Sequence, residues 1–306
     1  MHEIFLNIFF GLASLVFAYP AAAPQALCAW SPYVGVHSSE HLGLPTSFDN
    51  SQLNRVYELD AVGAVRGVRL DLKPWSQEFK KFAQKLNSRV DVLGILETRI
   101  LSLPKEQWQP YIDDALTQYR GLVKTFEIGN EVDIFSSPPM APKKYAQVLR
   151  DIYEYVSAKY PWAKIIPAAF NGDVSGPGYL QNFVNADPDL IKRLGVINIH
   201  CYRCEETIPQ YKEIINKLNA GRGADVKVWV TETGVQDWNE QINWVKNIYP
   251  KLKRELGAQR IYFYVFAQPS TSSDSQFALL NWNQQKNTFE ASPLYKVLKN
   301  FRSCIR

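Results

Sequence analysis

Short apolar runs and longer amphipathic segments alternate along most of this chain. Eight runs rich in Val, Ile and Phe begin roughly 25 to 40 residues apart, the length of one strand, one helix and two connections. No linker or low-complexity tract interrupts the series. The pattern predicts strands at Tyr33–Val36, Ala64–Leu70, Asp91–Leu96, Phe126–Gly129, Ile165–Ala169, Val196–Ile199, Lys227–Val230 and Arg260–Phe266.

The segments between these runs have the spacing of helices. Apolar residues recur three or four positions apart in Pro142–Tyr160, so that they share one helix face. Further helices are predicted at Trp75–Asn87, Glu106–Tyr119, Pro209–Asn219, Asn239–Leu256 and Pro293–Phe301. Eight such β/α units predict an α/β protein of the (β/α)8 TIM-barrel type. A doubly wound open sheet is the competing architecture, but it would usually offer a Gly-rich phosphate turn after an early strand, and here that turn reads His37-Ser38-Ser39-Glu40.

The N-terminus has the pattern of a secretory signal. An apolar run precedes the small-residue stretch Ala21-Ala22-Ala23, so residues 1–23 are predicted to be a signal peptide and the protein to be secreted. The first residues contain no Lys or Arg, which leaves an uncleaved anchor or a buried N-terminal element as alternatives. No later stretch is apolar enough to span a bilayer. Residues 28–306 are then expected to form one catalytic domain, because barrels of this class occupy about 250 residues.

Four cysteines follow the signal, and an even number in a secreted chain suggests two disulfides. Three pairings are possible. Cys28 with Cys304 would tie the termini together and leave Cys201 with Cys204 as a local bridge. A zinc half-site or a redox pair are the other interpretations of the latter two, but zinc would need two more ligands, and the four His residues are scattered. We expect no metal and no cofactor.

The net charge of +4 is mild and spread along the 306 residues, and no basic block stands out. Nucleic acid is therefore not an expected partner. The expected partner is a polysaccharide or oligosaccharide substrate, with no membrane contact after signal removal, and we expect a monomer.

Chemistry in such barrels lies at the carboxyl ends of the strands, so the polar residues that follow each apolar run are the candidates. These are His37, Asp71, Glu97, Asn130, Glu131, Asn171, His200, Tyr202, Glu232 and Gln268. Two glutamates stand out, Glu131 after the fourth strand and Glu232 after the seventh. A structural role as a cap or ion-pair partner is the alternative for each alone. Glu127 lies inside its strand and is expected to pair with an arginine such as Arg66 or Arg69.

The strand ends Gly129-Asn130-Glu131-Val132 and Thr231-Glu232-Thr233-Gly234 resemble the signature of the clan of retaining glycoside hydrolases on β/α barrels. By this resemblance Glu131 is the general acid/base, Glu232 is the nucleophile and Asn130 holds the sugar 2-hydroxyl. Retaining hydrolysis independently needs two carboxyl groups about 5 Å apart, and the fourth and seventh strands can face each other across a barrel mouth. We expect the pKa of Glu131 to be raised by the neighbouring Glu232.

Other positions are similar to the clan's pattern with less specificity. His200 and Tyr202 match its His-x-Tyr, in which the Tyr hydroxyl touches the nucleophile, and Arg69 matches an arginine bound to that nucleophile. Packing roles, or pairing of Arg69 with Glu127, are the alternatives. Many clan members have a Trp after the eighth strand, where this chain reads Tyr264-Val265-Phe266-Ala267-Gln268-Pro269. Gln268 or Trp282 is expected to replace it, and His37 is a further expected substrate contact.

The two glutamate motifs are nearest to the plant and fungal β-1,3-glucanase family, although Val235-Gln236 stands where that family has Trp-Pro. The resemblance implies a β-glucan substrate, with β-mannan, xylan and smaller β-glycosides as alternatives. Transglycosylation of cell-wall glycan would use the same residues. A catalytically silent carbohydrate-binding barrel is the third possibility, against which the presence of both glutamates argues.

Overall fold

The computed structural model describes residues 34–38, 46–134, 139–220 and 225–301, with the backbone alone for 34–38 and 46–49. Its main sheet has nine parallel strands, in the order β5-β4-β3-β2-β1-β9-β8-β7-β6. They are β1 (Val34–Ser38), β2 (Gly67–Asp71), β3 (Asp91–Leu96), β4 (Thr125–Ile128), β5 (Lys164–Pro167), β6 (Phe170–Asn171), β7 (Val196–Cys201), β8 (Lys227–Thr233) and β9 (Ala258–Phe263).

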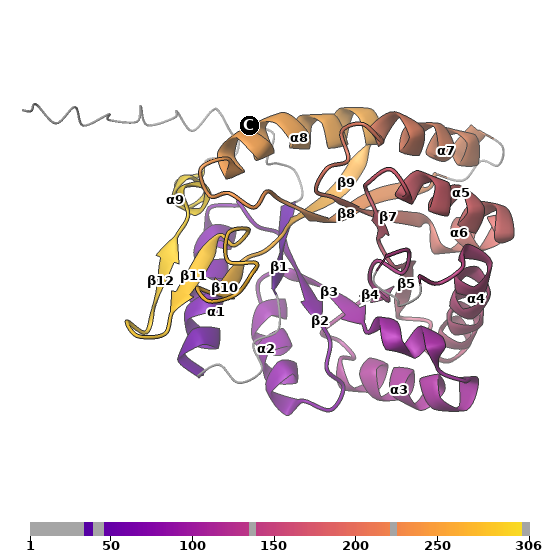
Figure 1. Ribbon diagram of the computed structural model, residues 1–306. Helices are drawn as coiled ribbons and strands as arrows, with labels where there is room; N and C mark the ends of the chain where they lie inside the picture. Colours follow the sequence, from indigo (N-terminus) through magenta and orange to yellow (C-terminus); the bar gives the residue numbers. More distant parts are fainter. Residues whose placement is uncertain (1–33, 39–45, 135–138, 221–224, 302–306) are drawn as a thin grey trace, which may run out of the picture.

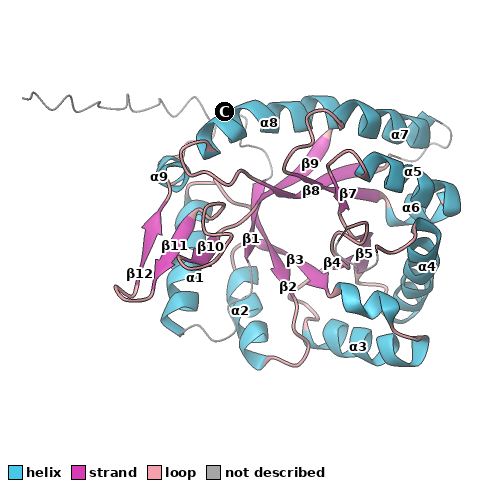
Figure 2. Ribbon diagram, viewed as in Figure 1, coloured by secondary structure: helices cyan, strands magenta, loops and turns pink. Residues whose placement is uncertain are grey.

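The two edge strands of this sheet are two parts of one barrel strand. β5 pairs with β4 and β6 pairs with β7, and only Ala168 and Ala169 separate them in the chain. The sheet therefore closes into a barrel of eight strands, in which β5 with β6 is the fifth and β7, β8 and β9 are the sixth to eighth. Figure 2 shows this ring of strands with helices outside it. The predicted TIM barrel is confirmed.

The helices are α1 (Thr46–Ala61), α2 (Gln77–Asn87), α3 (Lys105–Gln118), α4 (Pro142–Lys159), α5 (Gly176–Ala186), α6 (Pro188–Leu194), α7 (Ile208–Ala220), α8 (Gln241–Leu256) and α9 (Pro293–Leu298). A 3-10 helix, Thr98–Ser102, lies between β3 and α3. The six predicted helices agree with the structure to within three residues at either end. The helix α4 shows why, since Tyr145, Leu149, Ile152 and Val156 form one buried face and Pro142 occupies its first turn, where a missing N–H has no cost.

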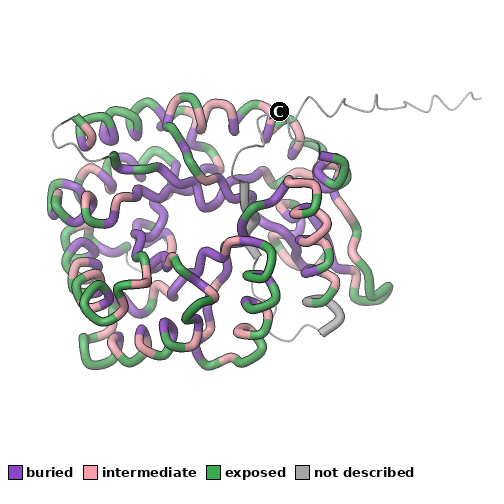
Figure 3. Tube along the Cα trace, turned by 180° about the vertical axis from the view of Figure 1, so that it is seen from behind, coloured by how far each residue is buried: buried purple, intermediate pink, exposed green. Residues whose placement is uncertain are grey.

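Apolar side chains pack in two separate groups. A large cluster lies between the strands and the helices, and a small one consists of Leu93, Ile166, Val196, Trp229 and Tyr262. The small cluster takes one side chain from each of five barrel strands, so it fills the barrel interior. Figure 3 shows burial along the strands and exposure on the outer sides of the helices. No helix in the described ranges is both long and apolar enough to traverse a bilayer.

After the last barrel strand, the chain departs from the prediction. The strand predicted to reach Phe266 ends at Phe263, and the chain then forms a separate sheet of β10 (Ala267–Pro269), β11 (Leu280–Asn283) and β12 (Thr288–Ala291). The residues beyond Phe263 are still apolar and buried, so hydrophobicity could not separate a continuing strand from a buried turn. Figure 1 shows the extra sheet beside α1, at the margin of the barrel.

Candidate active site

A sharp turn after β4 carries the first glutamate. Gly129 has φ +84°, and a side chain there would bring its Cβ within 2.8 Å of Leu101. Glu131 itself has φ +44°, a left-handed conformation that an L-residue adopts only under constraint. Its amide donates to the carbonyl of Ala169 at 3.2 Å, which helps to hold that conformation. Strain of this kind clusters at functional sites.

The carboxyl of Glu131 is buried against a neutral imidazole. Its residue is 5% exposed, and Oε1 lies 2.7 Å from Nδ1 of His200. Burial raises the pKa of Glu131 to about 7; the positive charge of Arg69 opposes this rise and Asp173 adds to it. The expected cause, repulsion from Glu232, is not the main one. Burial likewise lowers the pKa of His200 to about 4, so its imidazole is neutral near pH 7.

The carboxyl of Glu232 lies near the end of β8 and contacts two donors. Arg69 Nη1 is ion-paired with its Oε1, and the hydroxyl of Tyr202 donates to its Oε2 at 2.5 Å. Glu232 is 6% exposed, as buried as Glu131. Each of its two carboxyl oxygens therefore has a contact with a donor.

The Arg69 side chain contacts residues inside the barrel as well as residues of the candidate active site. It is fully buried in β2 and makes a double contact with Glu127, Nε to Oε2 at 2.8 Å and Nη2 to Oε1 at 3.0 Å. Nη2 also donates to Oδ1 of Asn130 at 2.7 Å. The predicted pairing of Glu127 with an arginine is therefore confirmed. The two alternatives posed for Arg69 are both realised, because the same guanidinium contacts Glu127 and Glu232.

The two glutamates approach each other closely around His200. One carboxylate oxygen of each and a ring nitrogen of His200 all lie within 4.8 Å of one another, and Nδ1 is 3.4 Å from Oε2 of Glu232. Three such groups could chelate a cation. However, Arg69 already places a fixed positive charge on Glu232, so this set of donors suits proton transfer and carboxylate chemistry better than metal binding.

An open cleft of about 500 Å³ leads from the two glutamates to the surface. It is lined by Arg69, Asp71, Ile95, Asn130, Glu131, Ile134, Asn171, Asp173, Tyr202, Arg203, Glu232, Tyr264, Asp274 and Phe277. From the sequence, Asp71 and Asn171 were predicted only to be polar residues at strand ends. The pKa of Asp71 is raised to about 6, chiefly by burial, which the charge of Arg69 opposes.

One wall of the cleft is aromatic and was not predicted. The rings of Tyr202, Tyr264 and Phe277 pack at centroid distances of 5.5 to 5.9 Å. Tyr264 follows β9, and its hydroxyl donates to Asp274 at 2.8 Å. Phe277 comes from the polar loop between β10 and β11. These rings lie on the side where a Trp after the eighth strand was expected, and a polar loop sequence gives no signal that one of its residues reaches the cleft.

Two expected substrate contacts are placed elsewhere. Trp282 is 1% exposed and packs edge-on against Phe289 at 4.9 Å in the extra sheet, which leaves no ring face for a sugar. Gln268 is buried in β10 and is not among the described residues that line the cleft. The prediction for Trp282 was wrong because the chain leaves the barrel after Phe263, whereas a substrate contact by Gln268 stays a prediction. For His37 the structure describes the backbone, which pairs with Arg69 in the sheet.

The local disulfide is present. Cys201 ends β7 and is bonded to Cys204, with a Cα–Cα distance of 5.0 Å, so the predicted bridge is confirmed and the zinc and redox-pair readings are not needed. Tyr202 and Arg203 lie inside this four-residue ring. Cys28 and Cys304 lie outside the described residues.

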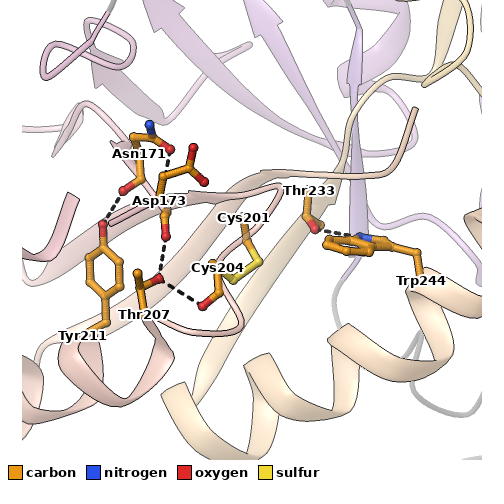
Figure 4. The surroundings of a disulfide bond; sticks show 9 residues. Asn171, Asp173, Cys201, Cys204, Thr207, Tyr211, Thr233 and Trp244 are labelled. Carbon is orange, nitrogen blue, oxygen red and sulfur yellow. Dashed lines mark hydrogen bonds between the residues drawn. A yellow bond between two sulfur atoms is a disulfide. The ribbon is translucent and has the colours of Figure 1, made fainter. Parts of the chain in front are cut away.

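The segment around the disulfide is packed tightly, as Figure 4 shows. The Thr207 hydroxyl contacts the carbonyl oxygens of Gly172 and Cys204 at 2.5 and 3.0 Å. A Cβ on Gly172 would come within 2.2 Å of the carbonyl oxygen of His200, so only glycine fits there. Tyr211 donates to the carbonyl of Asn171 at 2.5 Å. The ring is thus held firmly beside Glu232.

A closed β/α barrel with two buried, adjacent glutamates at its carboxyl end defines the class of barrel glycoside hydrolases. The sequence profile described as glycosyl hydrolase catalytic core matches residues 108–291, more than half of the chain. The chain belongs to this family. No curated protein matches it by sequence.

Several solved structures share the fold at low identity. A family 39 glycoside hydrolase from Bacteroides cellulosilyticus has 17% identity and a TM-score of 0.68, over 91% of this chain and 65% of that one. This chain therefore spans less than two thirds of that protein. A GH128 endo-β-1,3-glucanase from Amycolatopsis mediterranei, solved with laminaritriose, has 14% identity and a TM-score of 0.54, over 88% and 99%. A β-mannanase from Thermomonospora fusca has 9% identity and a TM-score of 0.56, over 90% and 94%.

Proposed function

We propose that this protein is a secreted, retaining β-glycoside hydrolase that cleaves a β-glucan by double displacement. The observation that carries the proposal is the closeness of the two carboxylates, whose nearest oxygens lie within 4.8 Å of each other. Retaining enzymes keep the groups about 5 to 5.5 Å apart, whereas inverting enzymes need about 6.5 to 9.5 Å to admit a water molecule.

The contacts of the two glutamates support their different roles. We assign Glu232 as the nucleophile, because Arg69 pairs with its Oε1 and Tyr202 donates to its Oε2, which fixes the carboxyl group in place. Glu131 is the acid/base, because a pKa of about 7 lets it hold a proton at neutral pH and release it. The neutral His200 then orients the Glu131 carboxyl without supplying a second charge.

The reaction follows in two steps. An oxygen of Glu232 bonds to the anomeric carbon while the bond to the glycosidic oxygen breaks, and the proton of Glu131 moves to that departing oxygen. Water then attacks the anomeric carbon of the glycosyl–enzyme from the face that the leaving group vacated, opposite Glu232. Glu131 takes the proton of this water, and Glu232 leaves as a carboxylate.

Asn130 is suited to hold a sugar hydroxyl during both steps. Its Oδ1 accepts from Arg69, so its Nδ2 is left as a donor, and the residue lines the cleft. A donor fixed in this way can strengthen its hydrogen bond as charge develops on the ring.

The choice of β-glucan rests on the motif resemblance and on the fold shared with a β-1,3-glucanase solved with laminaritriose. The fold shared with a β-mannanase keeps mannan as the nearest alternative. Secretion rests on the N-terminal apolar run and is consistent with a disulfide beside the site.

The decisive experiment is proton NMR of the first products released from laminarin, a soluble β-1,3-glucan. We expect the β-anomer to appear first and then to mutarotate. Initial release of the α-anomer would exclude Glu232 as the attacking group. A parallel screen on β-mannan, xylan and aryl β-glycosides separates the reaction type from the choice of glycan.

A further inference from the structure

We propose that Trp75 forms a distal sugar-binding subsite, on which a β-glucan chain rests after it leaves the catalytic cleft. The inference rests on the proposed function and deepens it, because it makes the substrate an extended polymer rather than a short glycoside. Trp75 lies in the loop after β2 and is 57% exposed.

The first observation is where the exposed apolar surface lies. Among the residues whose burial is described, the large hydrophobic side chains that are exposed are Trp75, Ile134 and Val174. They follow β2, β4 and β6, so all three lie on loops at the carboxyl ends of barrel strands. Ile134 lines the cleft, and Val174 follows the cleft residue Asp173. The large apolar side chains that are exposed in the described residues thus lie at the same end of the barrel as the cleft.

The second observation is that polar residues connect the cleft to Trp75. Asp71 and Ile95 line the cleft near the ends of β2 and β3. The loop that follows β2 carries Trp75, and the segment that follows β3 carries Arg99. The charge of Glu97 acts on Asp71. Glu97 in turn pairs with Lys73 at 2.8 Å and with Arg99.

The third observation is that neighbouring side chains hold the indole in place while the residue stays 57% exposed. Lys73 Nζ and the Arg99 guanidinium lie over the ring, 5.6 and 5.3 Å from its centre, and Tyr111 packs against it at 6.2 Å. The backbone of the loop is fixed as well, since Gln118 donates to the carbonyls of Lys73 and Ser76.

This combination matches the chemistry of a pyranose ring. The C–H face of a β-linked glucose can lie on the exposed part of an indole, and the neighbouring ammonium, guanidinium and carboxylate groups of Lys73, Arg99 and Glu97 can bond its hydroxyls. These groups carry both signs of charge, which suits a neutral sugar better than an ionic ligand.

The test compares a polymer with a short substrate. For Trp75→Ala, we expect kcat/KM on laminarin to fall up to about tenfold, the loss of one ring contact. We expect dinitrophenyl β-laminaribioside to be too short to reach Trp75, so its kcat/KM should change by less than about twofold. Trp75→Tyr keeps an aromatic face and should restore most of the activity on laminarin.

Binding gives a second readout that does not depend on turnover. In the Glu232→Gln background, calorimetry should show weaker laminarin affinity after Trp75→Ala and unchanged laminaribiose affinity. With Trp75 intact, KM should also fall as laminari-oligosaccharides lengthen.

The outcomes are separable. Equal losses on both substrates, or none on either, would overturn the subsite while leaving the hydrolase intact. Failure of the unmodified protein on laminarin combined with activity on mannan would overturn the choice of glycan, and Trp75→Ala should then be repeated on mannan. Inactivity on every glycan would overturn the proposed function itself.

Discussion

The two sides of the cleft bury a glutamate to the same depth but surround it differently. Glu232 is 6% exposed and contacts Arg69 and Tyr202, whereas Glu131 is 5% exposed and contacts the neutral His200. Burial penalises a carboxylate charge on both sides. At Glu131 this penalty raises the pKa of the carboxyl group to about 7, whereas at Glu232 a cation and a hydroxyl contact the two carboxyl oxygens. The neighbouring groups, rather than the depth of burial, therefore give the two glutamates different roles.

The test with the largest expected effect replaces each of the two glutamates in turn. We expect Glu232→Ala to lose roughly 10⁴-fold or more of kcat on all substrates, because no covalent intermediate can form. Glu131→Ala should instead still form the glycosyl–enzyme rapidly from dinitrophenyl glycosides, whose leaving group needs no proton, whereas its hydrolysis should be slow because no base activates the water. Steady-state kinetics on laminarin and on the activated substrate would measure both effects.

Added azide distinguishes the two variants by stereochemistry. With Glu131→Ala, azide should attack the glycosyl–enzyme and give a product that retains its configuration. With Glu232→Ala, azide should replace the missing nucleophile and give the inverted product. An exchange of these behaviours would reverse the two roles.

The environment of Glu232 can be tested by replacing Arg69, which pairs with it. Arg69→Met leaves Glu127 and Glu232 buried near each other without their cation, and we expect it to lower the free energy of unfolding by about 3 to 5 kcal/mol. Urea denaturation followed by tryptophan fluorescence would measure the loss. Arg254→Met, at a side chain that is 67% exposed, is the matched control and should change stability by less than about 0.5 kcal/mol. Equal midpoints for the two variants would contradict this role of Arg69.

A smaller loss should follow the removal of one hydroxyl. Tyr202→Phe removes the donor to Glu232 and should lower kcat/KM by about 10- to 100-fold, as expected for a hydrogen bond to a charged group. Tyr264→Phe removes a hydroxyl from the same aromatic wall, but that hydroxyl donates to Asp274. Its loss should be the smaller of the two. A larger loss for Tyr264→Phe would mean that the wall, rather than the bond to the nucleophile, matters.

The pH profile gives the subtlest test of the acid/base side. Glu131 is active as an acid only while it is protonated, so kcat/KM on laminarin should fall as the pH rises through about 7. Glu131→Ala assayed on dinitrophenyl glycosides should lack this alkaline fall. Its persistence in the variant would assign the titration to another group.

The sequence predicted what depends on strand order. Eight apolar runs, and a glutamate after the fourth and seventh, were sufficient to place Glu131 and Glu232 together, because the carboxyl ends of barrel strands meet at one mouth. The pairing of Arg69 with Glu127 could be predicted for a related reason, since a charge inside a buried strand needs a partner.

The residues that form the walls of the cleft could not be predicted from the order of the strands. Phe277 and Asp274 come from a polar loop with no periodicity, and loops of this kind can point a side chain anywhere. Trp282 shows the converse error, because an aromatic residue near a predicted loop was in fact core. The helix α1 was missed because its apolar residues are less clearly gathered on one helix face than those of α4, although the two sequences are equally polar.

The disulfide ring that encloses Tyr202 has a practical consequence. We expect production in a reducing cytosol, or dithiothreitol in an assay, to open this ring and remove one constraint on the loop that carries Tyr202. Turnover should then be slower than in the oxidised protein, because Tyr202 donates to Glu232. A sample's free-thiol content, rather than its fold, is therefore the quality measure to record before any rate is compared between preparations.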